Sequence, residues 1–211
     1  MQILTTQALL EKYKDYSNPA DKIKRETEKQ NLISLKKGLY VDDKNLEGAL
    51  LAQFIYGPSY LSFEYALWYY DMIPEGIMHT YTSATFSKRK RKIYENYFGT
   101  YIYKDVPKAA FSVGVKTEEY EGTTYLIATK EKALCDKLYI MPPVRTLKDI
   151  KDMLFDDLRI DEDIVYSLNK DDLMFLSSLY HSNNVSLLAK LVSKGEESWI
   201  VYWTIWLRTM I

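Results

Sequence analysis

The chain has 211 residues, enough for one large domain or for a small domain and a medium one. Hydrophobic residues make up 47% and charged residues 27%, a composition typical of soluble globular proteins. The single cysteine, Cys135, excludes an internal disulfide framework and a multi-cysteine metal site, and it fits a reducing, cytoplasmic location. No basic segment followed by an apolar one comes after Met1, so we expect no secretory signal.

The formal net charge of −1 conceals blocks of opposite sign. Residues 1–41 carry 8 basic and 5 acidic groups, and residues 86–108 carry 7 basic and 2 acidic groups. Residues 42–85 carry 1 basic and 6 acidic groups, and residues 109–172 carry 9 and 14. This asymmetry suggests a polyanion-binding face on an otherwise acidic body.

The first helix is expected directly after Thr5, a good capping residue. Asn18 begins a second helix, because asparagine is a favoured N-cap and the proline that follows it is tolerated in the first turn. Only Ala20, Ile23 and Thr27 form an inward stripe on this second helix, and charged residues occupy most of the rest. A stripe this thin predicts shallow packing and a largely free helix surface.

Two short β-forming runs, 32–35 and 39–41, are separated by Lys36-Lys37-Gly38. This pattern predicts a hairpin with a type I turn and a glycine bulge. A charged helix followed by a basic hairpin is typical of winged-helix DNA-binding modules. We therefore predict a small winged helix-turn-helix domain over residues 1–43.

Phosphate contacts supply most of the affinity of such a module, and base contacts from the helix supply sequence preference. Lys22, Arg25 and Lys29 share one helix face by spacing. The predicted DNA contacts are Asn18, Lys22, Arg25, Lys29, Lys36 and Lys37. The alternative is a solvated helix held by i,i+4 ion pairs such as Lys22–Glu26.

Residues 44–195 read as a second, α+β domain. Helices are predicted at 46–55, 62–73 and 129–141, and strands of a mostly antiparallel sheet at 78–86, 98–106, 111–116 and 123–128. Further helices are predicted at 146–154, 162–168, 170–180 and 185–193. The fold class is therefore α+β, with a small winged helix-turn-helix, a mixed domain and C-terminal helices.

The tail, residues 196–211, is apolar and rich in tryptophan. Residues 198–211 as a helix would be about 21 Å long, short of the roughly 20 residues that a membrane span needs. We expect no membrane insertion. Docking onto the body and formation of a homo-oligomer through this tail both remain open.

The densest run of charge is Lys88, Arg89, Lys90, Arg91 and Lys92. Five cations cannot be buried unpaired, so the run predicts an exposed loop between two strands. Such a loop can contact phosphate, RNA or an acidic partner, or it can simply be solvated.

An enzyme is not indicated. His79 and His181 are the only histidines and lack metal-ligand spacing, and no glycine-rich phosphate loop or nucleophile elbow is present. Cys135 lies among apolar residues and is interpreted as core, and Lys132 and Asp136 as a helix salt bridge. We therefore predict no catalytic residues, no metal and no cofactor.

Three segments together resemble the AbiEi-like antitoxins of type IV toxin–antitoxin (abortive-infection) systems. They are KIKRETEKQNLISLKKGLYV at 22–41, YLSFEYALWYYDMIPEG at 60–76 and TYLIATKEKALCDKLY at 124–139. The matching positions are Gly38, Leu39, Tyr40, Ser62, Ala66, Leu67, Lys132, Ala133, Leu134 and Asp136. Asp71 departs from the family pattern, since it stands where glycine is common.

The resemblance implies a winged-helix DNA-binding domain followed by an α/β domain. It also implies an antitoxin that represses its own operon at the promoter DNA and antagonises a nucleotidyltransferase-like toxin, with direct toxin binding not required. The alternative is a non-enzymatic protein-interaction module with a degenerate winged helix that does not bind DNA.

Overall fold

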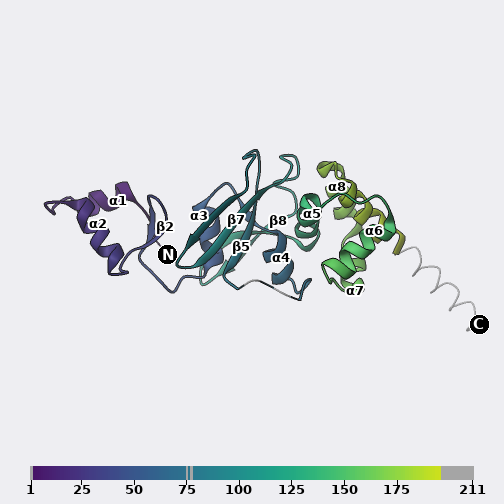
Figure 1. Ribbon diagram of the computed structural model, residues 1–211, viewed down its shortest axis with the longest axis horizontal. Coiled ribbons are helices and arrows are strands. Elements are labelled where there is room, and N and C mark those ends of the chain that lie inside the picture. Colours follow the sequence, from purple (N-terminus) through teal and green to yellow (C-terminus); the bar gives the residue numbers. More distant parts are fainter. Residues whose placement is uncertain (1, 75, 77, 196–211) are drawn as a thin grey trace, which may run out of the picture.

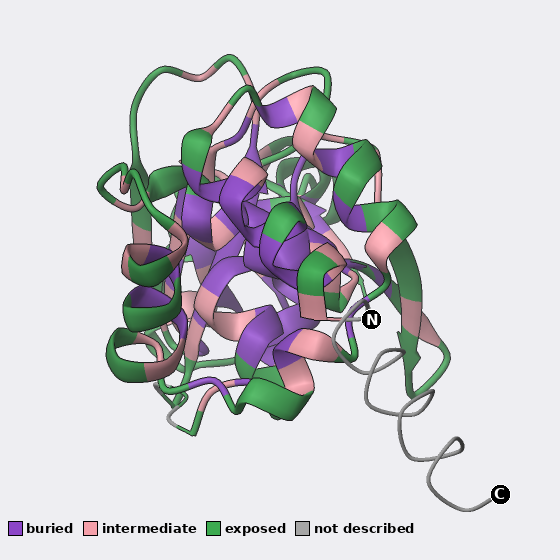
Figure 2. Ribbon diagram, turned by 90° about the vertical axis from the view of Figure 1, so that its right-hand side faces the viewer, coloured by how far each residue is buried: buried purple, intermediate pink, exposed green. Residues whose placement is uncertain are grey.

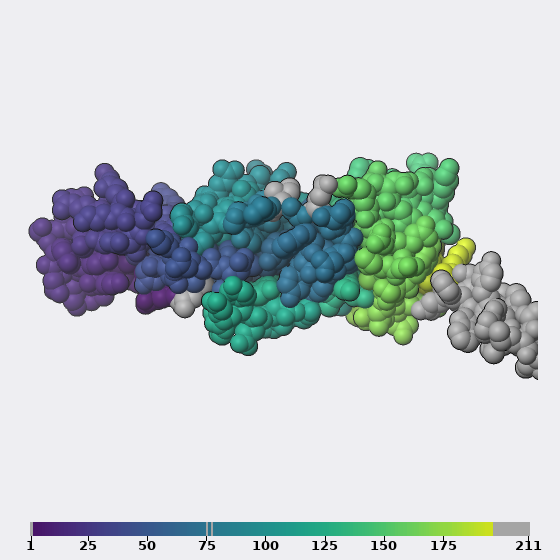
Figure 3. All heavy atoms as spheres, turned by 90° about the horizontal axis from the view of Figure 1, so that it is seen from below, coloured from purple at the N-terminus to yellow at the C-terminus, as the bar shows by residue number. Residues whose placement is uncertain are grey.

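The computed structural model describes residues 2–74, 76 and 78–195 and belongs to the α+β class. Three parts follow one another along its longest axis in sequence order (Figure 1). A small N-terminal module lies at one end, a six-stranded sheet with its helices lies in the middle, and a group of C-terminal helices lies at the other end. The space-filling view shows the same order (Figure 3). The predicted tail, 196–211, lies outside the described residues.

The N-terminal module contains two helices and three short strands. In order they are β1 (Ile3–Thr5), α1 (Thr6–Lys12), α2 (Pro19–Glu28), β2 (Ile33–Lys36) and β3 (Leu39–Val41). The strands form an antiparallel sheet in the order β1-β3-β2. Thr5 caps α1 and Asn18 caps α2, as predicted, and Gly38 adopts φ +85° in the hairpin turn. Strand β1 was not predicted, and Ala20, expected to face inward, is exposed.

The small sheet has two buried faces, because successive side chains of a strand point to opposite sides. Toward α1 and α2, Leu4 joins Leu9, Ile23 and Leu32 in a small core against which Tyr40 packs. On the other face, buried Ile33, Leu35 and Val41 belong to the core of the body. The side-chain amide of Asn96 also donates to the carbonyl of Leu35 at 3.1 Å. The module is therefore packed against the body.

The central sheet is mixed. Its strands are β4 (Tyr60–Leu61), β5 (Thr80–Thr85), β6 (Lys92–Asn96), β7 (Gly99–Asp105), β8 (Val115–Tyr120) and β9 (Thr123–Ala128), in the order β6-β7-β5-β4-β9-β8. The β5–β7 and β4–β9 pairs are parallel, and the other three pairs are antiparallel. Strands β5, β7 and β9 lie within predicted strands. The prediction at 111–116 is wrong for its first part, where residues 111–114 form a turn, and β4 and β6 were not predicted.

Helical segments cover both faces of the sheet. On one face lie η1 (Gly48–Leu51) and α3 (Ala52–Ile55), and the hydroxyls of Tyr101 and Tyr103 donate to the carbonyls of Gly48 and Ala52 at 3.1 and 2.7 Å. On the other lie α4 (Phe63–Tyr69) and α5 (Lys130–Ile140). Many tyrosines are thus core residues with a bonded hydroxyl, as their amphipathic ring requires. Asp71, just after α4, adopts φ +55°, a conformation that favours glycine.

The C-terminal part is helical, as predicted. It comprises α6 (Leu147–Lys151), a π-helical turn η2 (Asp152–Asp157), α7 (Glu162–Tyr166), α8 (Lys170–Tyr180) and a helix over 183–195. Their buried faces turn inward and their exposed faces outward (Figure 2). Buried Asn184 ties this part to the end of α5, because its amide donates to the carbonyls of Leu138 and Pro142 at 3.0 Å each. No helix in the described part of the chain has the length and apolar character to cross a membrane.

Candidate nucleic-acid interface

Asn18 is engaged as the cap of α2. Its side-chain oxygen accepts the Asp21 backbone N–H at 3.2 Å, and its amide donates to the Asp21 carboxylate at 2.9 Å. These bonds satisfy an otherwise unpaired N–H of the first helical turn. The sequence predicted Asn18 both as the N-cap of α2 and as a DNA contact, and the contacts of its side chain are those of an N-cap.

Lys22 is held within the protein. Its ammonium bonds Glu26 at 2.7 Å and lies 5.0 Å from the ring centroid of Tyr16 and 5.9 Å from that of Tyr13. The hydrogen bond to Glu26 raises the pKa of Lys22 and lowers the pKa of the Glu26 carboxyl. The ion pair is the i,i+4 alternative considered from the sequence and lies within α2, and the contacts with Tyr13 and Tyr16 join α2 to the segment that links the two helices.

Arg25 in α2 and Lys29 at its C-cap are the available cations of this segment. Both side chains are exposed, and neither has an ion-pair partner among the residues that the structure describes. Lys24 is also exposed, with its ammonium 3.9 Å from the Glu28 carboxylate. A surface pair at that distance contributes little and is readily exchanged for another anion.

The two hairpin lysines differ. The ammonium of Lys36 donates to the backbone carbonyl of Ile55, the last residue of α3, and so joins the hairpin to the body. The strand register shifts between Ser34 and Lys36, and Lys36 belongs to β2, where it pairs with Leu39. Lys37 is exposed and, within the described ranges, has no ion-pair partner. Sequence reasoning could not separate Lys36 from Lys37, because the carbonyl that binds Lys36 is 19 residues away.

The basic run 88–92 lies after β5, at the far end of β6 from the N-terminal module. Arg89, Lys90, Arg91 and Lys92 are exposed, as predicted, and Lys88 is partly buried with its ammonium 5.3 Å from the ring centroid of Tyr56. Lys92 is the first residue of β6, a strand that was not predicted, so the loop is shorter than the 87–97 connection expected between the predicted strands. The exposed cations of this loop are therefore a different group from those of α2.

A buried polar network lies in the body. Lys132 and Asp136 form a fully buried ion pair at 3.2 Å, and the carboxylate accepts hydrogen bonds from the hydroxyls of Ser62 (2.6 Å), Tyr60 (3.0 Å) and Tyr180. The Lys132 ammonium also donates to a backbone carbonyl at 2.8 Å. Burial lowers the pKa of Lys132, opposed by the charge of Asp136, and burial raises the pKa of the Tyr180 hydroxyl. This network joins α5 to β4 and α8 and is fully occupied by its own partners.

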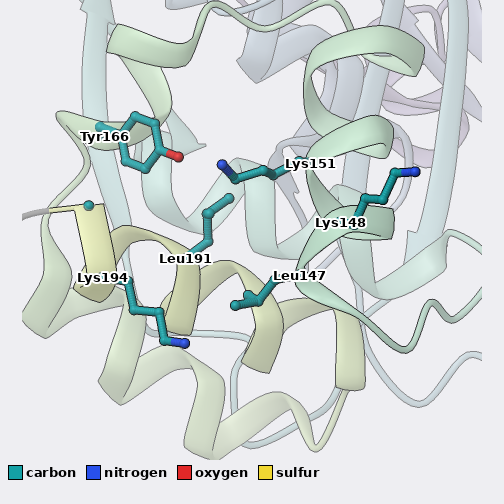
Figure 4. Close-up of a pocket in the computed structure, with 7 residues that line it drawn as sticks. Leu147, Lys148, Lys151, Tyr166, Leu191 and Lys194 are labelled. Carbon is teal, nitrogen blue, oxygen red and sulfur yellow. The ribbon is translucent and has the colours of Figure 1, made fainter. Parts of the chain in front are cut away.

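A pocket of about 440 Å³ lies between α6, α7 and the helix over 183–195 (Figure 4). It is lined by Leu147, Lys148, Lys151, Tyr166, Leu191, Lys194 and Gly195. The lysine side chains diverge: Lys151 points toward the Tyr166 hydroxyl, whereas Lys148 and Lys194 point elsewhere. The lining is therefore not arranged around one anion.

The histidines and the single cysteine differ in exposure. His79 and His181 are both exposed, and burial raises the pKa of the Cys135 thiol, so this core residue stays protonated. Over residues 2–74, 76 and 78–195, no group of three or more histidine, cysteine or acidic side chains could hold a metal ion. The sequence matches no family model, and no curated protein is significantly similar to it.

Proposed function

We propose that this protein binds the promoter DNA of its own operon and represses it, as the antitoxin of a type IV toxin–antitoxin pair. The order β1-α1-α2-β2-β3 fits a winged helix-turn-helix in which α2 is the recognition helix and the β2–β3 hairpin is the wing. With 10 residues, α2 is about 15 Å long, a suitable size for a major groove about 12 Å wide.

The observation that carries the DNA-binding proposal is the placement of α2. It lies at one end of the molecule, with β2 between it and the body (Figure 1). Its exposed Arg25 and Lys29 have no ion-pair partner in the part of the chain that the structure describes. A helix at the end of the molecule with exposed, unpaired cations can approach a duplex without a clash from the body.

We assign roles by availability. Arg25 reads a base, because arginine bonds guanine bidentately, and Lys29 and Lys37 contact phosphates. Lys22 and Lys36 position the helix and the hairpin, since each already has an internal partner. This assignment narrows the set of DNA contacts inferred from the sequence.

The antitoxin part of the proposal rests on the resemblance to AbiEi-like antitoxins. The body, residues 44–195, would antagonise a nucleotidyltransferase-like toxin in the cytoplasm. The gene for that toxin would lie beside the gene for this protein. A gene for such a toxin in the adjacent reading frame supports this part, and its absence from both flanks counts against it.

Binding to promoter DNA and to unrelated DNA tests the repressor role. Arg25→Ala should reduce the preference for the promoter by roughly 10-fold or more, since one good bidentate contact is worth about 1–3 kcal/mol. Lys37→Ala should weaken binding to both DNAs about equally. Lys14→Ala, which removes an exposed cation paired with Glu11, is the control and should change neither.

Three outcomes would contradict the proposal. Equal losses from Arg25→Ala and Lys37→Ala would show that the base-reading residue is wrongly assigned. No preference for the promoter in the unmodified protein would remove the repressor role and favour the protein-interaction alternative. A decrease in salt dependence for Lys36→Met would show that this lysine contacts phosphate after all.

A further inference from the structure

The loop between β5 and β6 has a defined backbone. One carboxylate oxygen of Asp105 accepts the N–H groups of Lys88 and Arg89 at 2.7 Å each, and the other accepts the Thr85 hydroxyl at 2.7 Å. Ser87 and Arg89 adopt φ +56° and +63°, conformations that are unfavourable for residues other than glycine. Asp105 thus holds an energetically costly loop conformation in place, and the loop carries its cations on a fixed frame.

The charge of this loop is uncompensated. Arg89, Lys90, Arg91 and Lys92 are exposed and, as far as the structure describes the chain, have no ion-pair partner. The nearby carboxylate of Asp105 is already saturated by the loop backbone and Thr85. Neighbouring like charges repel one another, so this arrangement is stabilised by a polyanion.

Two further lysines, Lys104 in β7 and Lys137 in α5, share one carboxylate and so add little free charge to the loop. Lys104 and Lys137 both bond Glu64, at 3.2 and 2.7 Å. Burial lowers the pKa of Lys104, the charge of Glu64 and the hydrogen bond to it oppose this, and the charges of Lys137 and Arg91 lower it further. We call the exposed, unpaired cations of the loop the β5–β6 cationic surface; it comprises Arg89, Lys90, Arg91 and Lys92.

This surface lies apart from α2, although the preceding Lys88 rests on Tyr56, the neighbour of the Ile55 that binds Lys36 of the hairpin. The module contacts β6 at Asn96, whereas the loop precedes Lys92 at the other end of the strand. The strand between them spans about 14 Å at roughly 3.4 Å per residue. A ligand bound by the β5–β6 cationic surface therefore contacts a different part of the molecule from α2.

We propose that the β5–β6 cationic surface binds the phosphate backbone of nucleic acid without reading its sequence. A duplex carries one negative charge per about 1.7 Å of axis, a density that can satisfy adjacent cations on a short loop. An acidic protein partner fits less well, because the loop has no apolar side chain from 87 to 92 to form an interface core. This inference does not require that α2 binds DNA.

The test compares two triple variants of the full chain on a duplex of unrelated sequence. Arg89→Gln/Lys90→Gln/Arg91→Gln neutralises the loop, and Lys148→Gln/Lys151→Gln/Lys190→Gln neutralises three exposed lysines of the C-terminal helices. The loop variant should reduce the slope of log affinity against log salt by about 2.7, or 0.9 per cation, and the control variant should leave it unchanged. Lys90→Gln alone, at an exposed position, should reduce the slope by about 0.9 and guards against misfolding of the triple variant.

An unchanged slope in the loop variants, or an equal reduction in the control, would overturn the inference. Binding of polyglutamate as tight as that of the duplex would replace it with an acidic protein partner. A parallel RNA duplex shows which nucleic acid is preferred. The preference of the unmodified protein for promoter DNA over unrelated DNA is measured separately. If that preference is absent and the loop variant still reduces the salt slope, the repressor proposal fails and this inference stands.

Discussion

Replacement of Asp136 by leucine should strongly destabilise the body. The substitution leaves the buried Lys132 ammonium without its counter-ion, and removing one partner of a buried pair costs about 3–5 kcal/mol. The hydroxyls of Tyr60 and Ser62 also lose their acceptor, at about 1 kcal/mol each. The expected total is about 5 kcal/mol, a large part of the roughly 5–15 kcal/mol that stabilises a typical domain.

Lys132→Met should cost less. Asp136 would keep three hydroxyl donors, from Tyr60, Ser62 and Tyr180, which continue to solvate its carboxylate. We expect a loss of about 3 kcal/mol, or about 2 kcal/mol less than for Asp136→Leu. The asymmetry follows from the hydrogen bonds and would not arise from an isolated pair.

Urea unfolding followed by circular dichroism at neutral pH measures both losses. If Asp136→Leu is unfolded without denaturant, Asp136→Asn keeps the shape and one acceptor oxygen and brings the loss into range. Losses below about 1 kcal/mol for both single variants, or a larger loss for Lys132→Met, would refute this account of the network.

Two further predictions concern the body. Burial raises the pKa of Glu64, but the hydrogen bond from Lys137 and the charge of Lys104 outweigh it, so the folded-state pKa lies below the ordinary 4.5. The ionised Glu64 carboxylate therefore stabilises the fold fully above pH 4.5, and this contribution is lost as the pH falls through the lower folded-state pKa. In Glu64→Gln the free energy of unfolding should therefore decline less steeply in acid than in the unmodified protein. The same decline in both proteins would contradict this. Gly99→Ala should cost at least about 2 kcal/mol, because at φ +135° its Cβ would lie 2.0 Å from the His79 carbonyl oxygen. Gly122→Ala, at φ +73° with no atom within 4 Å, is the control and should cost less; equal thermal shifts would show that the contact is relieved elsewhere.

The sequence predicted the local elements better than their partners. Helix α8 and strand β9 have the predicted boundaries, because a capping Asn169 and a β-rich run are local signals. Strand β6 was missed because it begins within a basic run, and β4 because two residues carry no periodicity. Both strands exist through pairing with distant segments, which a local pattern does not contain.

The candidate site shows the same limit. The spacing of Lys22, Arg25 and Lys29 correctly identified a charged helix, but the tyrosines and Glu26 that hold Lys22 depend on how the helices pack. The pair Lys132–Asp136 was recognised as a helix salt bridge, but its burial depends on Ser62, 74 residues from Asp136. Charge patterns therefore identified the candidate DNA-binding side chains, and tertiary contacts decide which of these side chains remain available to bind DNA.

The affinity of the full chain for the DNA upstream of its own gene, measured against a shuffled duplex from low to moderate salt, tests the central claim most directly. With the β5–β6 loop neutralised by Arg89→Gln/Lys90→Gln/Arg91→Gln, the three cations assigned to DNA contact, Arg25, Lys29 and Lys37, predict a slope of about −2.7, or roughly a 40-fold loss between 50 and 200 mM salt. The account predicts this slope together with tighter binding to the upstream DNA at every salt concentration. Equal affinity for the two duplexes throughout would contradict it.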